Sequence, residues 1–257
     1  MHGTSLPWLD PIIAHRGASG VAPENTLAAI RRAVELGAHW VEVDVRQTAS
    51  GHLILMHDAT LARTTNGRGK IAATPYEKIA DLDAGGWFAP DFAGEPVPTL
   101  EAFVRLASKL DLCANIEIKT DPGDTDPGDT DPGEAEAVGR AVATLLRNQW
   151  PPNRPPPLLS SSSPEVLHGA AKMAANLPRG LVVRRVPSAA KLCEQARECV
   201  SIHVDHRFLT QAKTAHLIKN GYAILAYTVN RPARAKTLYA WGVAAIFIDY
   251  PEPERWR

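Results

Sequence analysis

The sequence predicts an α/β protein folded as a single (β/α)8 barrel, and three observations support this. Short apolar segments rich in β-branched residues alternate with amphipathic helical segments along most of the chain, which is typical of parallel βα units. One pair of candidate strands is too closely spaced to be parallel, so nine candidates reduce to eight barrel strands. The length of 257 residues is also typical of one barrel of this kind (a TIM barrel).

The predicted strands and helices alternate along the chain. Each candidate strand is a short apolar run bounded by polar, Gly or Pro residues, and the strands occupy residues 12–16, 40–46, 53–57, 113–119, 158–162, 180–183, 201–205, 223–229 and 244–249. Each candidate helix has apolar residues at helical spacing, with examples at residues 24–36, 100–110, 134–149 and 210–220. This order of elements predicts a parallel sheet covered by helices.

Residues 47–52 connect the second and third candidate strands. A parallel crossover needs roughly a dozen residues, which is more than this connection offers. Ser50 and Gly51 are typical turn residues. We therefore expect the strand at 53–57 to return antiparallel to the strand at 40–46.

Two segments interrupt the alternation of strands and helices. Residues 58–98 are rich in Gly and Ala, and we expect a small insertion near the C-terminal mouth with a short helix near 75–82. Residues 121–133 form the repeat DPGDTDPGDTDPG, which we interpret as an acidic low-complexity loop, because its acids lack the spacing of a calcium-binding loop. We expect the repeat on the mouth side, where it would modulate the approach of cations or anionic substrates. We expect residues 1–257 to form one domain with these two additions.

The composition limits the class of protein. Lys and Arg together number 28, as do Asp and Glu, so the zero net charge favours neither nucleic acid nor an anionic membrane as a partner. The three cysteines show no metal-binding spacing and are interpreted as reduced. The sequence shows neither a signal peptide nor an apolar stretch of about 18 residues, so we expect a cytoplasmic protein without stable membrane association. The oligomeric state stays open.

Polar residues are concentrated where the strands end. The C-terminal ends of barrel strands form the mouth at which catalysis takes place in this fold. The first strand ends at His15, the second carries Glu42 and Asp44, the return strand ends at His57, and the next barrel strand carries Glu117. Nearly all polar residues that interrupt the apolar strands thus fall at the predicted mouth, which indicates an active site there.

The three carboxylates predict a metal site. Glu42 and Asp44 lie two residues apart, so they share one face of their strand, and Glu117 should approach from the neighbouring strand. Converging carboxylates repel one another unless a cation neutralises them, and oxygen ligands favour Mg²⁺, Ca²⁺ or Mn²⁺ over zinc. The alternative is that the acids pair with the interior cations Arg16 and Lys119. The presence of two histidines nearby favours the metal site.

The remaining polar residues suggest phosphoryl transfer. Histidine titrates near neutral pH, so His15 and His57 can share the acid and base roles of one displacement. The guanidinium of Arg16 matches the geometry of a phosphate, and Lys119 adds a second positive charge. We interpret the other seven histidines as structural or surface residues. A hard cation, two cationic side chains and two histidines together indicate a phosphodiesterase.

Several motifs resemble one known family. The chain closely resembles the glycerophosphodiester phosphodiesterases, of the bacterial cytosolic type, in five motifs: HRGASGVAPENT (15–26), WVEVDVRQTASGHLILMHD (40–58), RTTNGRG (63–69), PTLEAF (98–103) and NIEIK (115–119). Three later segments extend the resemblance over nearly the whole chain, namely LLSSSSPEVL, AYTVN and GVAAIFIDYP. The resemblance implies a barrel that hydrolyses small-molecule glycerophosphodiesters to sn-glycerol 3-phosphate and an alcohol with one divalent cation, Mg²⁺ or Ca²⁺, with Mn²⁺ as a further option.

The resemblance also implies roles for single residues. The metal ligands would be Glu42, Asp44 and Glu117, and His15 and His57 would be the acid–base pair. Arg16 and Lys119 match the phosphate contacts. Glu24, in PENT, would support the site by capping the following helix or holding Arg16. Ser162 and Tyr227 depart from the family, which usually shows aromatic residues there, so we expect both in the pocket wall.

Three other functions fit the sequence less well. A phosphodiesterase that acts on lysophospholipids would need an exposed apolar lip, for which Trp87 and Phe88 are candidates. A barrel without catalytic activity is disfavoured because both histidines and all three acids are present. A phosphate-binding isomerase or aldolase would need Gly-rich turns after the last strands, and residues 228–232 lack them.

Overall fold

The computed structural model describes residues 6–120 and 131–256, and most of the acidic repeat lies outside them. The strands are β1 (Ile12–Ala14), β2 (Trp40–Gln47), β3 (Leu53–Leu55), β4 (Cys113–Ile118), β5 (Leu158–Ser161), β6 (Arg179–Val183), β7 (Ser201–Asp205), β8 (Ala223–Tyr227) and β9 (Ala245–Ile248). The α-helices are α1 (Leu27–Glu35), α2 (Leu100–Lys109), α3 (Pro132–Gln149), α4 (Pro164–Met173), α5 (Ala189–Gln195), α6 (Gln211–Lys219) and α7 (Pro232–Ala240).

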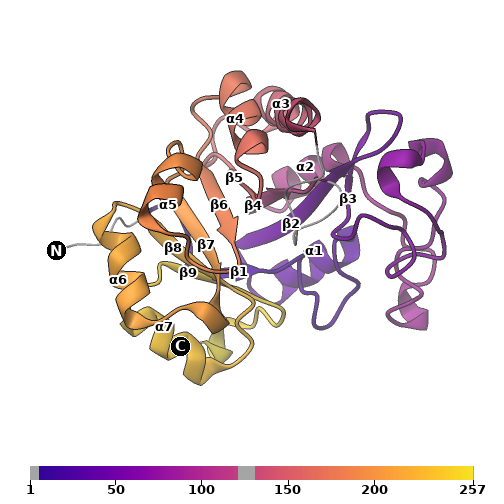
Figure 1. Ribbon diagram of the computed structural model, residues 1–257. Helices are drawn as coiled ribbons and strands as arrows, with labels where there is room; N and C mark the ends of the chain where they lie inside the picture. The colour runs from indigo at the N-terminus through magenta and orange to yellow at the C-terminus, as the bar shows by residue number, and fades with distance from the viewer. Residues whose placement is uncertain (1–5, 121–130, 257) are drawn as a thin grey trace.

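Eight parallel strands close into a barrel with helices around it (Figure 1). The strand order is β1-β9-β8-β7-β6-β5-β4-β2, and β1 pairs in turn with β2. The remaining strand, β3, lies antiparallel to β2, with Val45 opposite Leu55. Gly51 forms the turn between them at a φ of +84°, a conformation that favours glycine. The predicted barrel and its hairpin are therefore confirmed.

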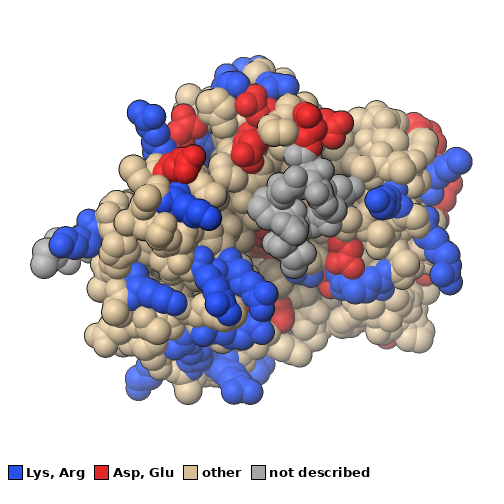
Figure 2. Space-filling view, viewed as in Figure 1, with Lys and Arg blue, Asp and Glu red and all other residues tan. Residues whose placement is uncertain are grey.

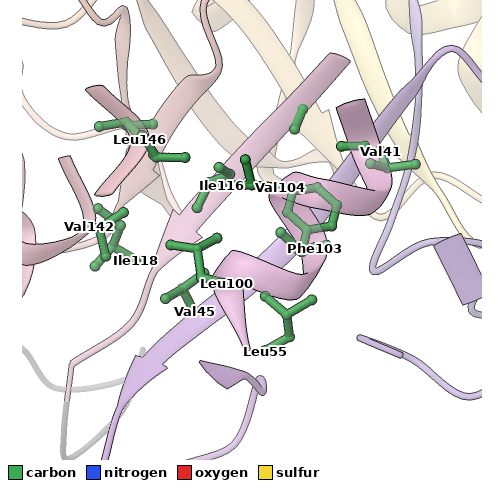
Figure 3. Close-up of a cluster of buried hydrophobic side chains, with 14 of the residues drawn as sticks. Val41, Val45, Leu55, Leu100, Phe103, Val104, Ile116, Ile118, Val142 and Leu146 are labelled. Atoms are coloured by element: carbon green, nitrogen blue, oxygen red, sulfur yellow. The ribbon is translucent and has the colours of Figure 1, made fainter. Parts of the chain in front are cut away.

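The layer between the sheet and the helices is apolar. Val41, Val43 and Val45 of β2 and Ile116 and Ile118 of β4 are buried against helical side chains (Figure 3). Because successive strand residues alternate sides, this outward apolar face turns Glu42, Asp44 and Glu117 into the barrel. Burial of a side chain of this size stabilises the fold by about 1.5–3 kcal/mol.

The floor of the barrel is also apolar. Trp40 is buried and shares a cluster with Ile13, Leu158 and Phe247, and the ring of Trp8 lies 5.8 Å from that of Trp40. Trp40 precedes Glu42 and Asp44 on the same face of β2, so the interior of the barrel changes from apolar to acidic along one strand. The acidic site thus rests on a packed floor.

Helices α3 and α4 pack closely because each contributes a glycine at their crossing. A Cβ on Gly139 would lie 2.1 Å from the carbonyl oxygen of Val166, and one on Gly169 would lie 2.2 Å from that of Glu136. Neither position therefore accommodates a larger residue without movement of a helix. Asp131, from the described end of the acidic repeat, caps α3 by accepting hydrogen bonds from the backbone N–H groups of Gly133 and Glu134.

The insertion at residues 58–98 packs Ile71, Ile79 and Val97 into a small apolar cluster that also includes Ile54 of β3. The short helix expected near 75–82 is a single 3₁₀ turn, η2 (Tyr76–Lys78), flanked by η1 (Ile71–Ala73) and η3 (Pro90–Phe92). A final 3₁₀ turn, η6 (Pro253–Arg255), follows β9, and η5 (His206–Phe208) follows β7. Among the described residues, no helix combines the length and the apolar character that a membrane crossing requires.

Several strands are shorter than the sequence predicted, mainly at the mouth. The expected strands included His15, His57 and Lys119, whereas β1, β3 and β4 end before these residues. The backbone of Arg16 lies in the left-handed region at φ 56°, so the chain turns away from β1 directly after His15. His15, His57 and Lys119 therefore belong to the turns that follow the strands, whereas Glu42, Asp44 and Glu117 lie within β2 and β4.

Candidate active site

The acidic cluster is assembled by the register of two adjacent strands. Strand β2 pairs with β4 so that Asp44 lies opposite Glu117, and Glu42 lies two residues earlier on the same face of β2. One carboxylate oxygen from each of the three residues lies within 4.8 Å of the others. Glu42 and Asp44 are almost completely buried. The three carboxylates therefore converge inside the barrel, as the sequence predicted.

Two cations also contact the acidic cluster. Lys119 Nζ lies 2.6 Å from Glu117 Oε1 and 3.3 Å from Asp44 Oδ1, and Arg16 Nε lies 3.2 Å from Asp44 Oδ2. Burial alone would raise the pKa of Asp44, but the charges of Lys119 and Arg16 outweigh it and hold that pKa well below its usual range. The acids therefore do pair with Arg16 and Lys119, as the alternative to a metal site predicted. These two cations neutralise the three carboxylates only in part.

Glu42 is the acid that these cations neutralise least. Burial raises its pKa, and the negative charges of Asp44 and Glu117 raise it further. Its Oε2 accepts a hydrogen bond from the backbone N–H of Arg16 at 2.9 Å. Its buried Oε1 accepts no hydrogen bond from any described residue. A buried carboxylate oxygen without a donor, beside two further carboxylates, fits a site for a hard divalent cation.

His15 lies directly after β1 and is held by the opposite end of the chain. Its Nδ1 lies 2.8 Å from Asp249 Oδ1, just beyond β9, the neighbour of β1. Ser19 Oγ donates to the same carboxylate at 3.0 Å, and Asn230 Nδ2 donates to its other oxygen. Burial and the charge of Arg16 lower the pKa of His15, while Asp249 opposes this effect. The ring is therefore oriented by a carboxylate and favoured in its neutral form.

His57 lies after β3 and has a carboxylate partner of its own. Its Nδ1 lies 2.7 Å from Asp58 Oδ1, and its carbonyl oxygen accepts a hydrogen bond from Arg46 Nε at 2.8 Å. Arg63 donates to Asp58 and holds its pKa well below the usual range, aided by His57 and against the effect of burial. In both candidate catalytic histidines, Nδ1 is thus hydrogen-bonded to an aspartate. This arrangement favours the tautomer with the proton on Nδ1 and the lone pair on Nε2.

Glu24 links the two halves of the site. Its Oε1 accepts a hydrogen bond from Arg16 Nη1 at 2.8 Å, and Arg63 Nη1 donates to its Oε2 at 2.8 Å. The helix that follows is capped by Thr26, whose hydroxyl accepts from the N–H of Ala29. Of the two supporting roles that the sequence suggested for Glu24, the structure therefore favours the contact with Arg16 over the helix cap.

One cavity of about 290 Å³ joins these groups at the mouth of the barrel. Its lining includes His15, Arg16, Glu42, His57, Glu117 and Lys119, together with Ser162 and Tyr227, which confirms that these two residues belong to the pocket wall. Asp44 and Glu24 lie behind this first layer, in contact with its members. All eight candidate site residues named from the sequence are thus brought together.

Several residues of the site were not predicted. Asn25 Nδ2 donates to Asp44 Oδ2 at 2.8 Å, and Asp58, Arg63 and Asp249 orient other members. His203, which the sequence analysis interpreted as a structural or surface residue, lines the cavity. Burial lowers the pKa of His203 to about 3, so its ring is neutral at physiological pH. Asp205 and Asp249 end or follow barrel strands, so the rule that identified Glu117 also applies to them. Arg63 lies in the insertion and follows no strand, so its signal was the motif RTTNGRG, which begins at this residue.

Comparisons with known proteins agree with this geometry. The model of the glycerophosphoryl diester phosphodiesterase family matches residues 15–253. A glycerophosphodiester phosphodiesterase from Caldanaerobacter subterraneus subsp. tengcongensis is 34% identical over 94% of each chain, and one from Bacillus subtilis is 31% identical over 93% of this chain and 83% of its own. A solved structure of an Oleispira antarctica phosphodiesterase, in complex with its product sn-glycerol-3-phosphate, superposes with a TM-score of 0.87 at 34% identity, covering 96% of each chain.

Proposed function

This chain belongs to the glycerophosphoryl diester phosphodiesterase family, and we propose that it hydrolyses glycerophosphodiesters to sn-glycerol 3-phosphate and an alcohol. The observation that carries the proposal is the pair of histidine–aspartate contacts, His15–Asp249 and His57–Asp58, in the cavity that also contains the acidic cluster. The family assignment and the product bound to the Oleispira antarctica relative agree with it.

Glu42, Asp44 and Glu117 would hold one divalent cation in this proposal. Mg²⁺, Ca²⁺ and Mn²⁺ all accept carboxylate oxygens, so the donor set does not distinguish among them. When bound, such a cation would withdraw electron density from an oxygen of the substrate and lower the pKa of a hydroxyl on it. Arg16 and Lys119 would contact the phosphate, and their pairing with the acidic cluster keeps them at its edge.

The histidines would move the protons. In the tautomer that the aspartates favour, Nε2 of one ring accepts the proton of the attacking hydroxyl or water. The other histidine, protonated at Nε2, donates to the leaving oxygen, so an alcohol departs instead of an alkoxide. Asp249 and Asp58 would stabilise the imidazolium forms while they exist. This division leaves the net charge of the site unchanged over a turnover, because one ring gains the proton that the other loses.

The cavity favours a water-soluble diester over a lysophospholipid. Trp87 is the exposed large apolar side chain among the described residues, with 42% of its surface accessible, but it does not line the cavity. The wall instead includes Arg184 and Arg207. The alternative substrate therefore lacks the apolar lip at the mouth that it would need.

The proposal is tested with metal-stripped enzyme and a panel of substrates. We expect release of glycerol 3-phosphate from glycerophosphocholine or glycerophosphoglycerol after addition of Mg²⁺, Ca²⁺ or Mn²⁺, and much slower hydrolysis of lysophosphatidylcholine. His15→Ala and His57→Ala should each lower kcat by ~10²-fold or more. His52→Ala is the matched control, because His52 is exposed and stacks on Tyr76 in the insertion. Full activity in excess chelator, or no release with any of the three cations, contradicts the proposal.

A further inference from the structure

Three arginines gather around one ring at the mouth. The guanidinium carbons of Arg184, Arg185 and Arg207 lie 5.3, 4.5 and 5.9 Å from the centroid of Phe208. Arg184 and Arg185 follow β6, and Arg207 and Phe208 follow β7, which pairs with β6 up to Val183 and Val204. The strand pairing therefore brings the three side chains together at the C-terminal end of the barrel.

This cluster has an excess of positive charge. Its carboxylate is Asp205, which is buried and bound to Arg207, with Nη2 2.6 Å from Oδ2. Within the described part of the chain, Arg184 and Arg185 have neither an ion pair nor a hydrogen bond of the side chain, so one carboxylate faces three guanidinium groups. The face of Phe208 offsets part of the repulsion. In Figure 2, Lys and Arg side chains gather over the half of the molecule that carries α5 to α7.

Two arginines of the cluster line the catalytic cavity, across the barrel from the acidic residues. Arg184 and Arg207 line the same cavity as His57 and Lys119. In the closed strand order, β6 and β7 lie opposite β1 and β2, whose residues include Glu42 and Asp44. A substrate whose phosphodiester contacts Arg16 and Lys119 would thus extend one of its two ester arms toward Arg184 and Arg207. An arm that carries an anionic group suits these cations better than the neutral glycerol does.

We propose that Arg184, Arg185 and Arg207 form a second anion-binding subsite, which receives an alcohol portion that carries a phosphate group of its own. This inference rests on the proposed function, because it assigns the second half of the substrate in that reaction. Planar guanidinium groups bind phosphate oxygens through paired, charge-assisted hydrogen bonds, and two of these groups have no carboxylate to compete among the described residues. A cationic alcohol such as choline would bind here less favourably than an anionic one.

The test compares two substrates that differ by one phosphate, glycerophosphoinositol and glycerophosphoinositol 4-phosphate. We expect wild-type kcat/KM to be ~10-fold or more higher for the second substrate at low salt, and the ratio to fall with ionic strength. Arg184→Gln combined with Arg185→Gln should lower this ratio by ~10-fold. A variant that is merely less stable would lose activity on both substrates and keep the ratio.

Arg197→Gln is the matched control. Arg197 is exposed and lies between α5 and the start of β7, at the opposite end of the barrel from the mouth, so its removal should leave the ratio unchanged. A wild-type ratio near one, or a double variant within twofold of the wild-type ratio, overturns the subsite.

Binding separates this inference from the proposed function. By calorimetry, inositol 4-phosphate should bind the wild-type enzyme ~10-fold more tightly than it binds the double variant, and inositol itself should not bind detectably. Phosphate-dependent binding without hydrolysis of either diester would support the subsite and contradict the proposed function. Hydrolysis of both diesters without phosphate-dependent binding would support the function and overturn the subsite.

Discussion

Arg63 holds Asp58 through two nitrogens, with Nε 2.6 Å from Oδ2 and Nη2 2.9 Å from Oδ1. The same guanidinium contacts both oxygens of Glu24, and Asp58 in turn contacts Nδ1 of His57. A continuous network of oppositely charged side chains therefore connects the candidate catalytic residue His57 to Glu24 through Asp58 and Arg63. Glu24 in turn accepts a hydrogen bond from Arg16. The insertion is thus joined to the active site by a positioning residue.

Replacement of Arg63 by Gln should impair catalysis without unfolding the protein. Loss of the guanidinium releases Asp58 from its fixed position and raises the pKa of that carboxyl, so His57 is oriented less firmly. We expect kcat to fall by ~10-fold or more with a smaller change in KM. Arg68→Gln is the control, because Arg68 is exposed in the same segment. Equal kinetics for the two variants would contradict a positioning role for Arg63.

Asp249→Asn should alter the protonation of His15. The carboxylate raises the pKa of His15 through its hydrogen bond and its charge, against burial and Arg16, so its removal should lower that pKa further. We expect kcat to fall by ~10²-fold, and the limb of the pH profile that His15 controls to move to lower pH. The double variant with His15→Ala should lose no more activity than His15→Ala alone. Additive losses would show that Asp249 acts elsewhere.

Divalent cations should stabilise the folded protein. A ligand at 100 times its dissociation constant contributes about 2.7 kcal/mol to the free energy of unfolding if it binds only the native state. We expect Mg²⁺, Ca²⁺ or Mn²⁺ to raise the Tm of metal-stripped protein, and Glu42→Gln to reduce the increase. Glu77→Gln, an exposed acid in the insertion, should respond like the wild type. The same Tm increase in both variants would argue against a metal site at Glu42.

His203 should make stability depend on pH in the acidic range. Burial lowers its pKa in the folded protein from 6.5 to about 3, so below pH 6.5 the unfolded chain binds a proton that the folded chain does not. The stability contributed by the neutral ring is complete above pH 6.5 and is lost as the pH falls toward 3, by about 1.4 kcal/mol per pH unit.

Urea unfolding at pH 7, 6 and 5 tests this dependence through His203→Asn. The variant should lose free energy of unfolding less steeply between pH 6 and 5 than the wild type, whatever its stability at pH 7. His216→Asn is the control, because His216 is exposed on α6. A slope equal to that of the wild type would show that His203 is protonated in the folded protein.

Local features of this protein follow from the order of neighbouring residues alone. Alternation along the strand WVEVDV places Glu42 and Asp44 on one face, because strand periodicity is a property of neighbouring residues. The short connection at 47–52 determined the hairpin that returns to His57. The family motifs also identified the seven residues proposed for catalysis, metal and phosphate binding without any coordinates.

The residues that orient these seven side chains come from distant parts of the chain and meet through the fold. Asp249 reaches His15 across 234 positions of the chain because β9 closes the barrel against β1. Arg63 reaches Glu24 across 39 positions because the insertion brings it against the segment that follows β1. The arginines after β6 and β7 meet at Phe208 through the register of two strands. Such contacts depend on closure of the barrel and not on local periodicity, so the pattern of the sequence could name the reactive groups but not their partners.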